Sequence, residues 1–221
     1  MHLHCFVGGS RYADGMPDAE TTSARRGPYA KTALRRTEII ESATAVFSAH
    51  GYQGGSLRQI AKQLDLSLTT VMHHFPTKVS LLAAVLEQED RADPDAEDRS
   101  RRDGFIPMVL GIVTRNLRRR ELVRMFSIVS AEATYPGHEA HEWLVARYAS
   151  VTASYADLIA HDRAAGRIRS DLDPRLLAEL VIGGWEGIQI RWLTDGTDPV
   201  AAMRTLLDQL LDPAPAPTPG R

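Results

Sequence analysis

The 221-residue sequence contains a single cysteine, Cys5, and its scarcity excludes two classes of protein. A disulfide framework needs pairs of cysteines, and a cysteine-based zinc site needs several. No apolar run approaches the roughly 20 residues that cross a bilayer. The first residues, MHLHCFVGGSRYADGMPDAE, also lack the charged-then-apolar order of a signal peptide. The sequence therefore predicts a cytoplasmic protein that has no membrane partner.

Catalytic motifs are scarce as well. Neither a glycine-rich phosphate loop nor a nucleophile elbow occurs. The segment YPGHEAHEW places His138 and His141 three residues apart, but this is one residue short of the HExxH spacing and no clear third ligand follows. A hydrated helix start explains the segment better than a metal site. We therefore predict a protein that is not an enzyme and needs no metal or cofactor.

Positive charge is concentrated near the N-terminal third of the chain. The formal net charge is −2, yet the stretch from Thr21 to Ser80 has eight Lys or Arg against three acids. The remainder is acidic. This division is typical of a polyanion-binding head joined to a body with another role.

Most of the chain shows apolar residues at helical spacing, without a strand pattern or an internal repeat. The pattern predicts an all-α protein. Helices are expected over residues 33–50, 57–64, 68–75, from 78 onward, 105–117, 121–134, 138–166, 174–196 and 199–211. The charged stretch 90–104, which contains Pro94, is expected to be a surface connection.

The segment Leu57 to Lys78, LRQIAKQLDLSLTTVMHHFPTK, predicts two short helices joined by a tight turn. Ser56 and Ser67 are suitable N-caps. Asp65 stands where the backbone must turn sharply, and Asp tolerates the left-handed region better than most side chains. Small Ala61 lies where the helices must approach closely. These features indicate a helix-turn-helix.

The order AVFSAHGY, then SLRQIAKQLDLSLTTVMHHFPTKVSLL, resembles the DNA-binding head of the TetR family of transcriptional regulators over roughly Thr37 to Leu86. The residues that carry the resemblance are Phe47, Gly51, Tyr52, Ile60, Ala61, Ser67, Thr70, His74, Phe75 and Lys78. Three positions depart from the family pattern. Asp65 stands where Gly is usual, Thr69 where a small residue is common, and Met72 where Tyr is common. The departures at Thr69 and Met72 fall on the recognition helix, so the family's DNA-sequence preference does not transfer to this chain.

The resemblance implies a three-helix helix-turn-helix head on an all-helical body for ligand binding and dimerisation. The expected organisation is a disordered extension at 1–30, a DNA-binding domain at 31–78, a body at 79–211 and a disordered tail at 212–221. Its expected function is that of a repressor released from its operator by a small molecule. The rival interpretation is an all-helical module for small molecules or proteins, whose basic head no longer reads specific DNA.

The predicted DNA-binding residues are Arg58, Ser67, Leu68, Thr69, Thr70, Met72, His73, His74 and Lys78. The N-terminal end of a recognition helix faces base edges, and the apolar and Thr side chains there suit thymine methyl groups. The resemblance adds His74 and Lys78 as phosphate anchors and Arg58 as a base contact. A solvated surface is the alternative for Arg58 and for the two histidines. The basic run from Arg25 to Arg36 is either an arm along phosphates or a solvated tail.

One helix-turn-helix contacts half of a site, so specific binding to a palindromic operator in double-stranded DNA requires two heads. The resemblance implies a homodimer formed through the last two helices. The predicted interface residues are Val181, Gly184, Trp185, Ile188, Leu206 and Leu210. The alternative is that these residues belong to the core.

The resemblance also implies a pocket for an unknown small-molecule ligand in the body. The candidate lining residues are Phe105, Met108, Ile112, Met125, Phe126, Tyr148, Tyr155, Trp185 and Gln189. Apolar and aromatic residues with a few polar groups are typical of such a site. Aromatic residues at helical spacing are more often core residues, and this remains the alternative for each of them.

Overall fold

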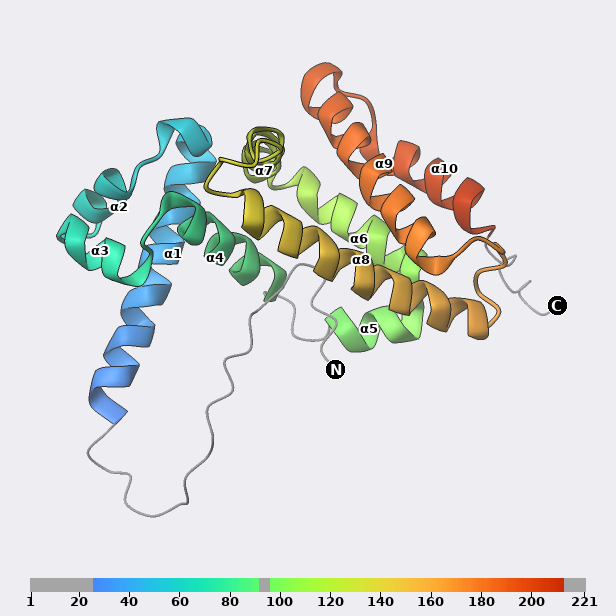
Figure 1. Ribbon diagram of the computed structural model, residues 1–221, viewed down its shortest axis with the longest axis horizontal. Helices are drawn as coiled ribbons and strands as arrows, with labels where there is room; N and C mark the ends of the chain where they lie inside the picture. The colour runs from blue at the N-terminus through green and yellow to red at the C-terminus, as the bar shows by residue number, and fades with distance from the viewer. Residues whose placement is uncertain (1–25, 92–95, 213–221) are drawn as a thin grey trace, which may run out of the picture. The chain divides into compact units, whose positions relative to one another are not determined.

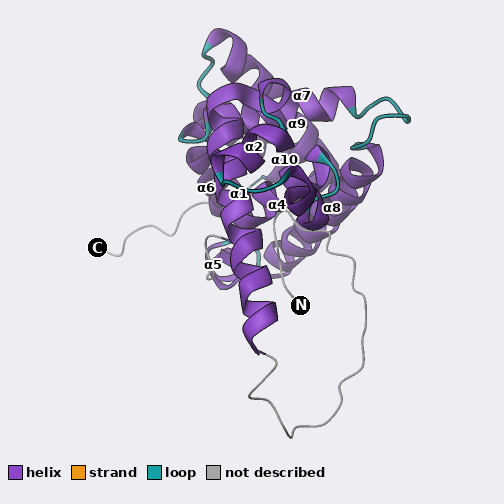
Figure 2. Cartoon of the chain, turned by 90° about the vertical axis from the view of Figure 1, so that its left-hand side faces the viewer, coloured by secondary structure: helices purple, strands orange, loops and turns teal. Residues whose placement is uncertain are grey.

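The computed structural model describes residues 26–91 and 96–212, which are almost entirely helical (Figure 1). Helices and connecting loops account for these residues, and no β-strand occurs among them (Figure 2). The chain divides into two compact units at Glu89–Asp90. We call the unit before this boundary the head and the unit after it the body. Of the predicted disordered segments, 1–30 and 212–221, residues 1–25 and 213–221 lie outside the described residues, whereas residues 26–30 are helical.

The head contains four helices. They are α1 (Arg26–Gly54), α2 (Leu57–Gln63), α3 (Leu68–His74) and α4 (Lys78–Arg91). Helix α1 begins earlier than the expected Ala33, so the basic residues from Arg26 to Arg36 are helical. The expected break at Gly51 is present as a non-helical residue within α1, with φ 68° and ψ 178°.

The head is held together by buried apolar side chains from all four of its helices. Its fully buried members include Ile39, Phe47, Ile60, Val71, Phe75, Leu81 and Leu82. Each of the four helices contributes to this set, which is the reason that short α2 and α3 are stable only as parts of the head.

The body contains six helices within residues 96–212. They are α5 (Ala96–Asp103), α6 (Phe105–Leu117), α7 (Arg120–Glu132), α8 (His141–Ala164), α9 (Pro174–Asp195) and α10 (Pro199–Leu211). Helix α9 packs against α7, α8 and α10, and α10 packs against α6. No helix in the described part of the chain is long and apolar enough to span a membrane.

The sequence marks the two C-terminal helices clearly. Asp173 and Asp198 are N-caps whose carboxylates accept hydrogen bonds from backbone N–H groups of the first turn, and Pro174 and Pro199 follow them. Gly196 ends α9 in the left-handed conformation, with φ 78°. These signals explain why the expected bounds of both helices agree closely with the observed ones.

The expectation that residues 90–104 form only a surface connection is wrong, because Ala96–Asp103 is helix α5. Ser100 is the one residue of the described part of this helix that is buried. The helix therefore has no apolar period from which it could be predicted. It ends at Gly104, whose N–H donates to the Ser100 carbonyl at 2.8 Å.

A buried carboxylate fixes the start of α6. Asp162 on α8 is 2% exposed. It accepts a hydrogen bond from the Phe105 N–H at 2.7 Å and forms an ion pair with Arg167 at 2.6 Å. Gly104 has φ 99°, and a Cβ atom there would lie 2.7 Å from Asp162 Oδ2. Only glycine satisfies both the backbone conformation and this close approach.

Candidate nucleic-acid interface

Helix α2 is capped at its start and buried on one face. The Ser56 hydroxyl accepts a hydrogen bond from the Gln59 N–H at 3.1 Å, as the sequence predicted. Ile60 and Ala61 are 0% and 3% exposed. The opposite face carries Arg58, which is exposed. Its guanidinium makes no hydrogen bond or ion pair with another described side chain, so it remains available to an external partner.

The turn between α2 and α3 is a Schellman motif. The Asp65 N–H donates to the Lys62 carbonyl at 3.3 Å, and the Leu66 N–H donates to the Ala61 carbonyl at 2.8 Å. This pattern needs a left-handed residue just past the helix, and Asp65 takes that conformation with φ 53°. Asp65 therefore makes the turn that glycine usually makes, at a conformational cost that glycine would not have.

Helix α3 has one buried and one exposed face. Ser67 caps it by accepting a hydrogen bond from the Thr70 N–H at 3.0 Å. Val71 is completely buried, whereas Thr69 and His73 are exposed and Met72 is 44% exposed. The remaining predicted base-reading residues, Leu68 and Thr70, are half-buried. The predicted reading residues thus include the most exposed side chains of the helix.

Thr70 has a structural contact as well as its predicted role. Its hydroxyl lies 2.8 Å from the Ser67 hydroxyl, so the two form a hydrogen bond at the first turn of α3. The hydroxyl is therefore already engaged in the N-cap. The Thr70 methyl group takes no part in this hydrogen bond.

His74 occupies the last position of α3, where it is half-buried. Burial lowers its pKa below the ordinary value, and the nearby positive charges of His73, Arg36 and Arg35 lower it further. The neutral imidazole therefore prevails near neutral pH. A neutral ring still has one N–H with which to donate a hydrogen bond to a phosphate oxygen.

Lys78 stands at the first position of α4, whose start is fixed by a reciprocal pair of hydrogen bonds. The Ser80 N–H donates to the Thr77 hydroxyl at 3.0 Å, and the Thr77 N–H donates to the Ser80 hydroxyl at 3.1 Å. The Lys78 ammonium lies 4.1 Å from the centroid of the buried Tyr52 ring. This cation–π contact holds the charge at the surface of the head.

Two basic residues of α1 have partners that the sequence did not predict. Arg35 forms an ion pair with Glu38 at 2.6 Å. Arg36 donates a hydrogen bond to the His74 carbonyl at 3.3 Å, and its guanidinium carbon lies 4.3 Å from the centroid of the Phe75 ring. Arg36 and His74 are 38 residues apart, so no local pattern could reveal this contact.

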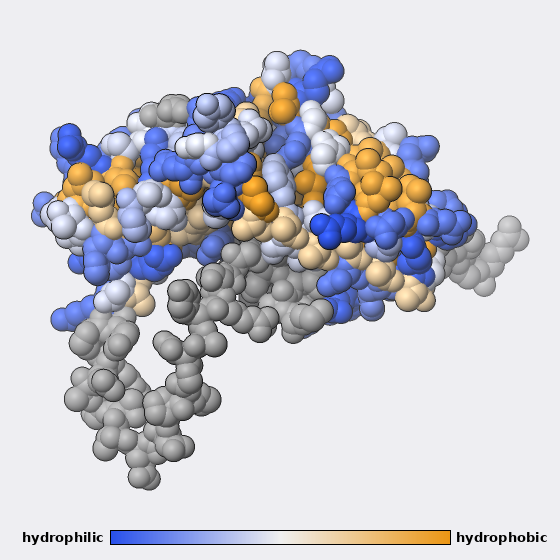
Figure 3. Space-filling model, viewed as in Figure 1, coloured by the Kyte–Doolittle hydropathy of each residue, from blue (hydrophilic) through white to orange (hydrophobic). Residues whose placement is uncertain are grey.

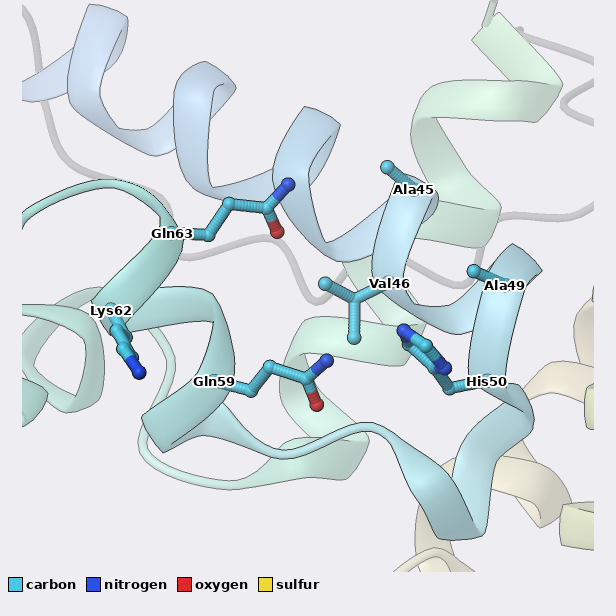
Figure 4. A pocket seen from close by; sticks show the side chains of 7 residues that line it. All are labelled: Ala45, Val46, Ala49, His50, Gln59, Lys62 and Gln63. Carbon is cyan, nitrogen blue, oxygen red and sulfur yellow. The ribbon is translucent and has the colours of Figure 1, made fainter.

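The head also has a surface cavity of about 550 Å³ on the side where α1 faces α2 (Figure 4). Its lining residues are Ala45, Val46, Ala49, His50, Gln59, Lys62 and Gln63. None of the predicted DNA-binding residues lines it. Its walls are part of the packing between the two helices, where Ser42 donates a hydrogen bond to Gln63 at 3.2 Å.

The structure separates the predicted ligand-lining residues of the body into two groups. Phe105 and Tyr155 belong to the hydrophobic core, with their ring centroids 5.1 Å apart, and Met108 and Trp185 pack against that core. Ile112 and Met125 are also buried. The second group lies outside this core cluster. It consists of Phe126 on α7, Tyr148 on α8 and Gln189 on α9.

Polar and aromatic side chains surround Tyr148 and Phe126. The Tyr148 hydroxyl donates a hydrogen bond to Glu186 on α9. Burial raises the pKa of Tyr148, and the bonded carboxylate raises it further. Arg147 is 5% exposed, and its guanidinium carbon lies 5.3 Å from the Phe126 ring centroid and 5.4 Å from that of Trp143.

Two of the predicted dimer-interface residues face the interior of the body. Val181 is 1% exposed. A Cβ atom on Gly184 would lie 2.2 Å from the Leu206 side chain of the same chain. Val181 therefore offers no surface to a second subunit, whereas Gly184 is half-buried. Trp185, Ile188, Leu206 and Leu210 are half-buried.

The two histidines of YPGHEAHEW have local partners. His138 accepts a hydrogen bond from the Ala140 N–H at 3.1 Å, and its Nε2 atom lies 3.8 Å from Glu132. His141 Nδ1 lies 2.8 Å from the Ala133 carbonyl oxygen. These contacts belong to the corner between α7 and α8.

The capped helix α2, the tight turn and the half-exposed helix α3 define a helix-turn-helix DNA-binding protein. The family model described as "Bacterial regulatory proteins, tetR family" matches residues 39–85, which contain this unit. The head of the chain therefore matches that of the TetR family of DNA-binding transcriptional regulators.

Three relatives illustrate the similarity. The HTH-type transcriptional repressor KstR of Rhodococcus jostii is 24% identical over 172 residues, 72% of this chain and 73% of KstR. The HTH-type transcriptional regulator PksA of Bacillus subtilis is 26% identical over 167 residues, 73% of this chain and 80% of PksA. The HTH-type transcriptional repressor AcnR of Corynebacterium diphtheriae is 39% identical, but over only 27% of this chain and 30% of AcnR.

Solved structures share the fold. A putative TetR-family regulator from Rhodococcus sp. has a TM-score of 0.66 and 24% identity, over 81% of this chain and 99% of that chain. A putative TetR-family regulator from Mesorhizobium loti has a TM-score of 0.60 and 22% identity, over 81% and 98%. The likeness extends through the head and the body and confirms the predicted all-α fold class.

Replacing Asp65 by glycine is expected to stabilise the head. Glycine adopts the left-handed conformation without the steric cost of a Cβ atom, which is about 1 kcal/mol for a residue such as Asp. Hydrogen exchange of the buried α2 and α3 amides in the full chain measures the effect, and exchange should slow in Asp65→Gly. Asp208→Gly is the matched control. Asp208 is exposed and helical within α10, so glycine there should destabilise. Faster exchange of the head in Asp65→Gly would contradict the assignment of strain to this turn.

Proposed function

We propose that the protein is a homodimeric repressor that binds a palindromic operator and leaves it when a small molecule binds the body. The observation that carries the DNA-binding part is the exposed reading face of α3, held between a capped N-terminus and a buried Phe75. The basic head supplies the attraction for phosphates. KstR and AcnR are both named as transcriptional repressors, which supports repression rather than activation.

Arg58 and Lys78 are expected to contribute to operator binding in different ways. Arg58→Ala removes an exposed guanidinium suited to a base edge and should cost about 1–3 kcal/mol of specific binding. Lys78→Ala removes a phosphate anchor, so it should weaken binding to all sequences and reduce the salt slope by about one. Gel-shift titrations on the protein's own upstream region at several salt concentrations measure both effects.

The control is Arg118→Ala, which removes an exposed charge from the body. It should leave binding unchanged. Wild-type affinity and salt dependence in both head variants would rule out Arg58 and Lys78 as anchors. A wild-type protein that binds operator and unrelated DNA equally would instead favour a head that no longer reads sequence.

The dimer is proposed to form through one exposed face of α9. Its residues are Leu176, Leu180, Gly183, Gly187 and Ile190, which are spaced alternately by four and three. Leu176, Leu180 and Ile190 are 44%, 42% and 53% exposed. Nothing lies within 4 Å of a Cβ atom built on Gly183 or Gly187. Apolar side chains gather over α9 and α10 in Figure 3.

This face is suited to a second copy of the same helix. The spacing of four and three places all five residues on one side of α9, and the two glycines allow close approach of another backbone. Of the predicted interface residues on α9, Val181 belongs to the core, Trp185 and Ile188 pack against it, and a Cβ atom on Gly184 would meet Leu206. The proposed interface is therefore rotated around α9 relative to the sequence-based prediction.

Ile190→Glu is expected to weaken the dimer, because association would bury a charge against apolar groups. Light scattering after gel filtration should give two chains for the wild type and a shift toward one chain for the variant. Val145→Glu on α8 is the matched control, since Val145 and Ile190 are both 53% exposed. A wild-type protein that remains a single chain at micromolar concentration, or equal masses for both variants, would contradict the proposed face.

The ligand site is proposed to lie beside Tyr148, Glu186 and Gln189. Gln189 is 3% exposed and lies one turn from Glu186 on α9. An amide at such a buried position is a polar group suited to hydrogen bonds with a ligand. Arg147 and Glu186 supply opposite charges, so the site favours a neutral molecule with both a donor and an acceptor.

Gln189→Leu is expected to remove the ligand response without harming the fold. Leucine has a similar size and no polar atoms, so the free energy of unfolding should stay close to that of the wild type. A thermal-shift screen of neutral small molecules should give hits that stabilise the wild type, lower its operator affinity and leave the variant unchanged. Gln209→Leu, at an exposed position of α10, is the control. A clear loss of stability in Gln189→Leu would show that the amide is already satisfied.

A further inference from the structure

Helix α3 is too short to fix its own orientation. It spans seven residues, Leu68–His74, and Val71 is its one buried side chain. Its N-terminus is capped by Ser67, two residues after the turn at Asp65. Its C-terminal end therefore needs a separate attachment to the rest of the head, because base recognition depends on exact placement of the helix in the groove.

Arg36 makes that attachment from α1. Its Nη1 atom donates a hydrogen bond to the His74 carbonyl, which is one of the last carbonyls of α3 and has no acceptor role within the helix. The guanidinium carbon lies over the ring of Phe75, which is 1% exposed. A cation at this position also opposes the partial negative charge at the C-terminus of a helix.

We propose that Arg36 is a positioning residue for DNA recognition, which holds the C-terminal end of the recognition helix against α1. The guanidinium makes two simultaneous contacts, a hydrogen bond to the His74 carbonyl and a cation–π contact with Phe75. A lysine has the same charge but cannot make both contacts in this geometry. This role rests on the proposed reading of a specific operator by α3.

The neighbouring Arg35 provides a matched control. It lies on the same helix, carries the same charge and forms its ion pair with Glu38, one turn along α1. Its charge acts on His74 at a distance, but among the described residues it makes no hydrogen bond or ring contact with α3. A role in general attraction of DNA would be shared by both arginines, whereas a role in positioning α3 belongs to Arg36 alone.

The test uses duplexes that the wild-type protein selects from a random library, compared with a scrambled duplex of the same length. Arg36→Lys should lower the ratio of specific to non-specific affinity about tenfold, the effect of losing one hydrogen bond from a charged donor. Its binding to the scrambled duplex and the salt slope should stay unchanged. Arg35→Lys should match the wild type in all three quantities.

Two results would overturn the proposal. The first is wild-type discrimination in Arg36→Lys combined with a salt slope reduced by one in Arg36→Gln, which would make Arg36 a phosphate contact. The second is an equal loss of both affinities in Arg36→Lys with a lower melting temperature, which would indicate a general structural role.

Failure of the proposed function has a separate signature. If the wild type selects no sequence from the library, the operator-reading function fails, and hydrogen exchange in α3 then decides the role of Arg36. Faster exchange of the Val71 and His74 amides in Arg36→Lys than in Arg35→Lys supports the attachment. Equal exchange in the two variants overturns it.

Discussion

The attachment of a two-turn helix at both of its ends is the constraint on which the head depends. A helix of this length is not stable alone, and its single buried residue, Val71, does not define its direction. The turn at Asp65 and the cap at Ser67 fix where the helix begins. Phe75, buried next to Arg36, fixes where it ends. Every proposed contact with DNA depends on these attachments, because they determine where the exposed side chains of α3 point.

The contacts around the interface also separate two kinds of basic residue. Arg36 and Lys78 lie against aromatic rings of the head, at 4.3 Å and 4.1 Å from the ring centroids. Arg58 is exposed and has no described side-chain partner. Residues of the first kind have a fixed direction before DNA arrives, which lowers the entropy cost of a phosphate contact by Lys78 and lets Arg36 hold α3 in place. Residues of the second kind can adapt to a base edge.

Much of the fold could be predicted from the sequence, because local signals mark the helix ends. Ser56, Ser67, Asp173 and Asp198 cap the helices that they precede, and Gly196 ends α9. The apolar period then identifies the buried faces between these signals. Helix α5 could not be predicted in this way, since it is charged, has a single buried residue in its described part and depends on contacts with Gly104 and Arg167.

The candidate sites show the same division between local and long-range information. The caps and exposed face of α3 follow from residues close in sequence, so the reading residues could be proposed from the motif. The contact between Arg36 and His74 crosses 38 residues, and the inward direction of Val181 and Gly184 depends on how α10 packs against α9. Apolar spacing shows that α9 has buried faces but not which face a second subunit would cover.

Selection of duplexes from a random library, followed by sequencing, tests the central claim most directly. A dimer with two reading helices predicts an enriched palindrome whose half-sites are centred about one helical turn, or a multiple of it, apart. Footprinting should show protection of both half-sites at the same protein concentration. Enrichment of a single half-site without symmetry, or of no sequence at all, would contradict a dimeric regulator that reads DNA through α3.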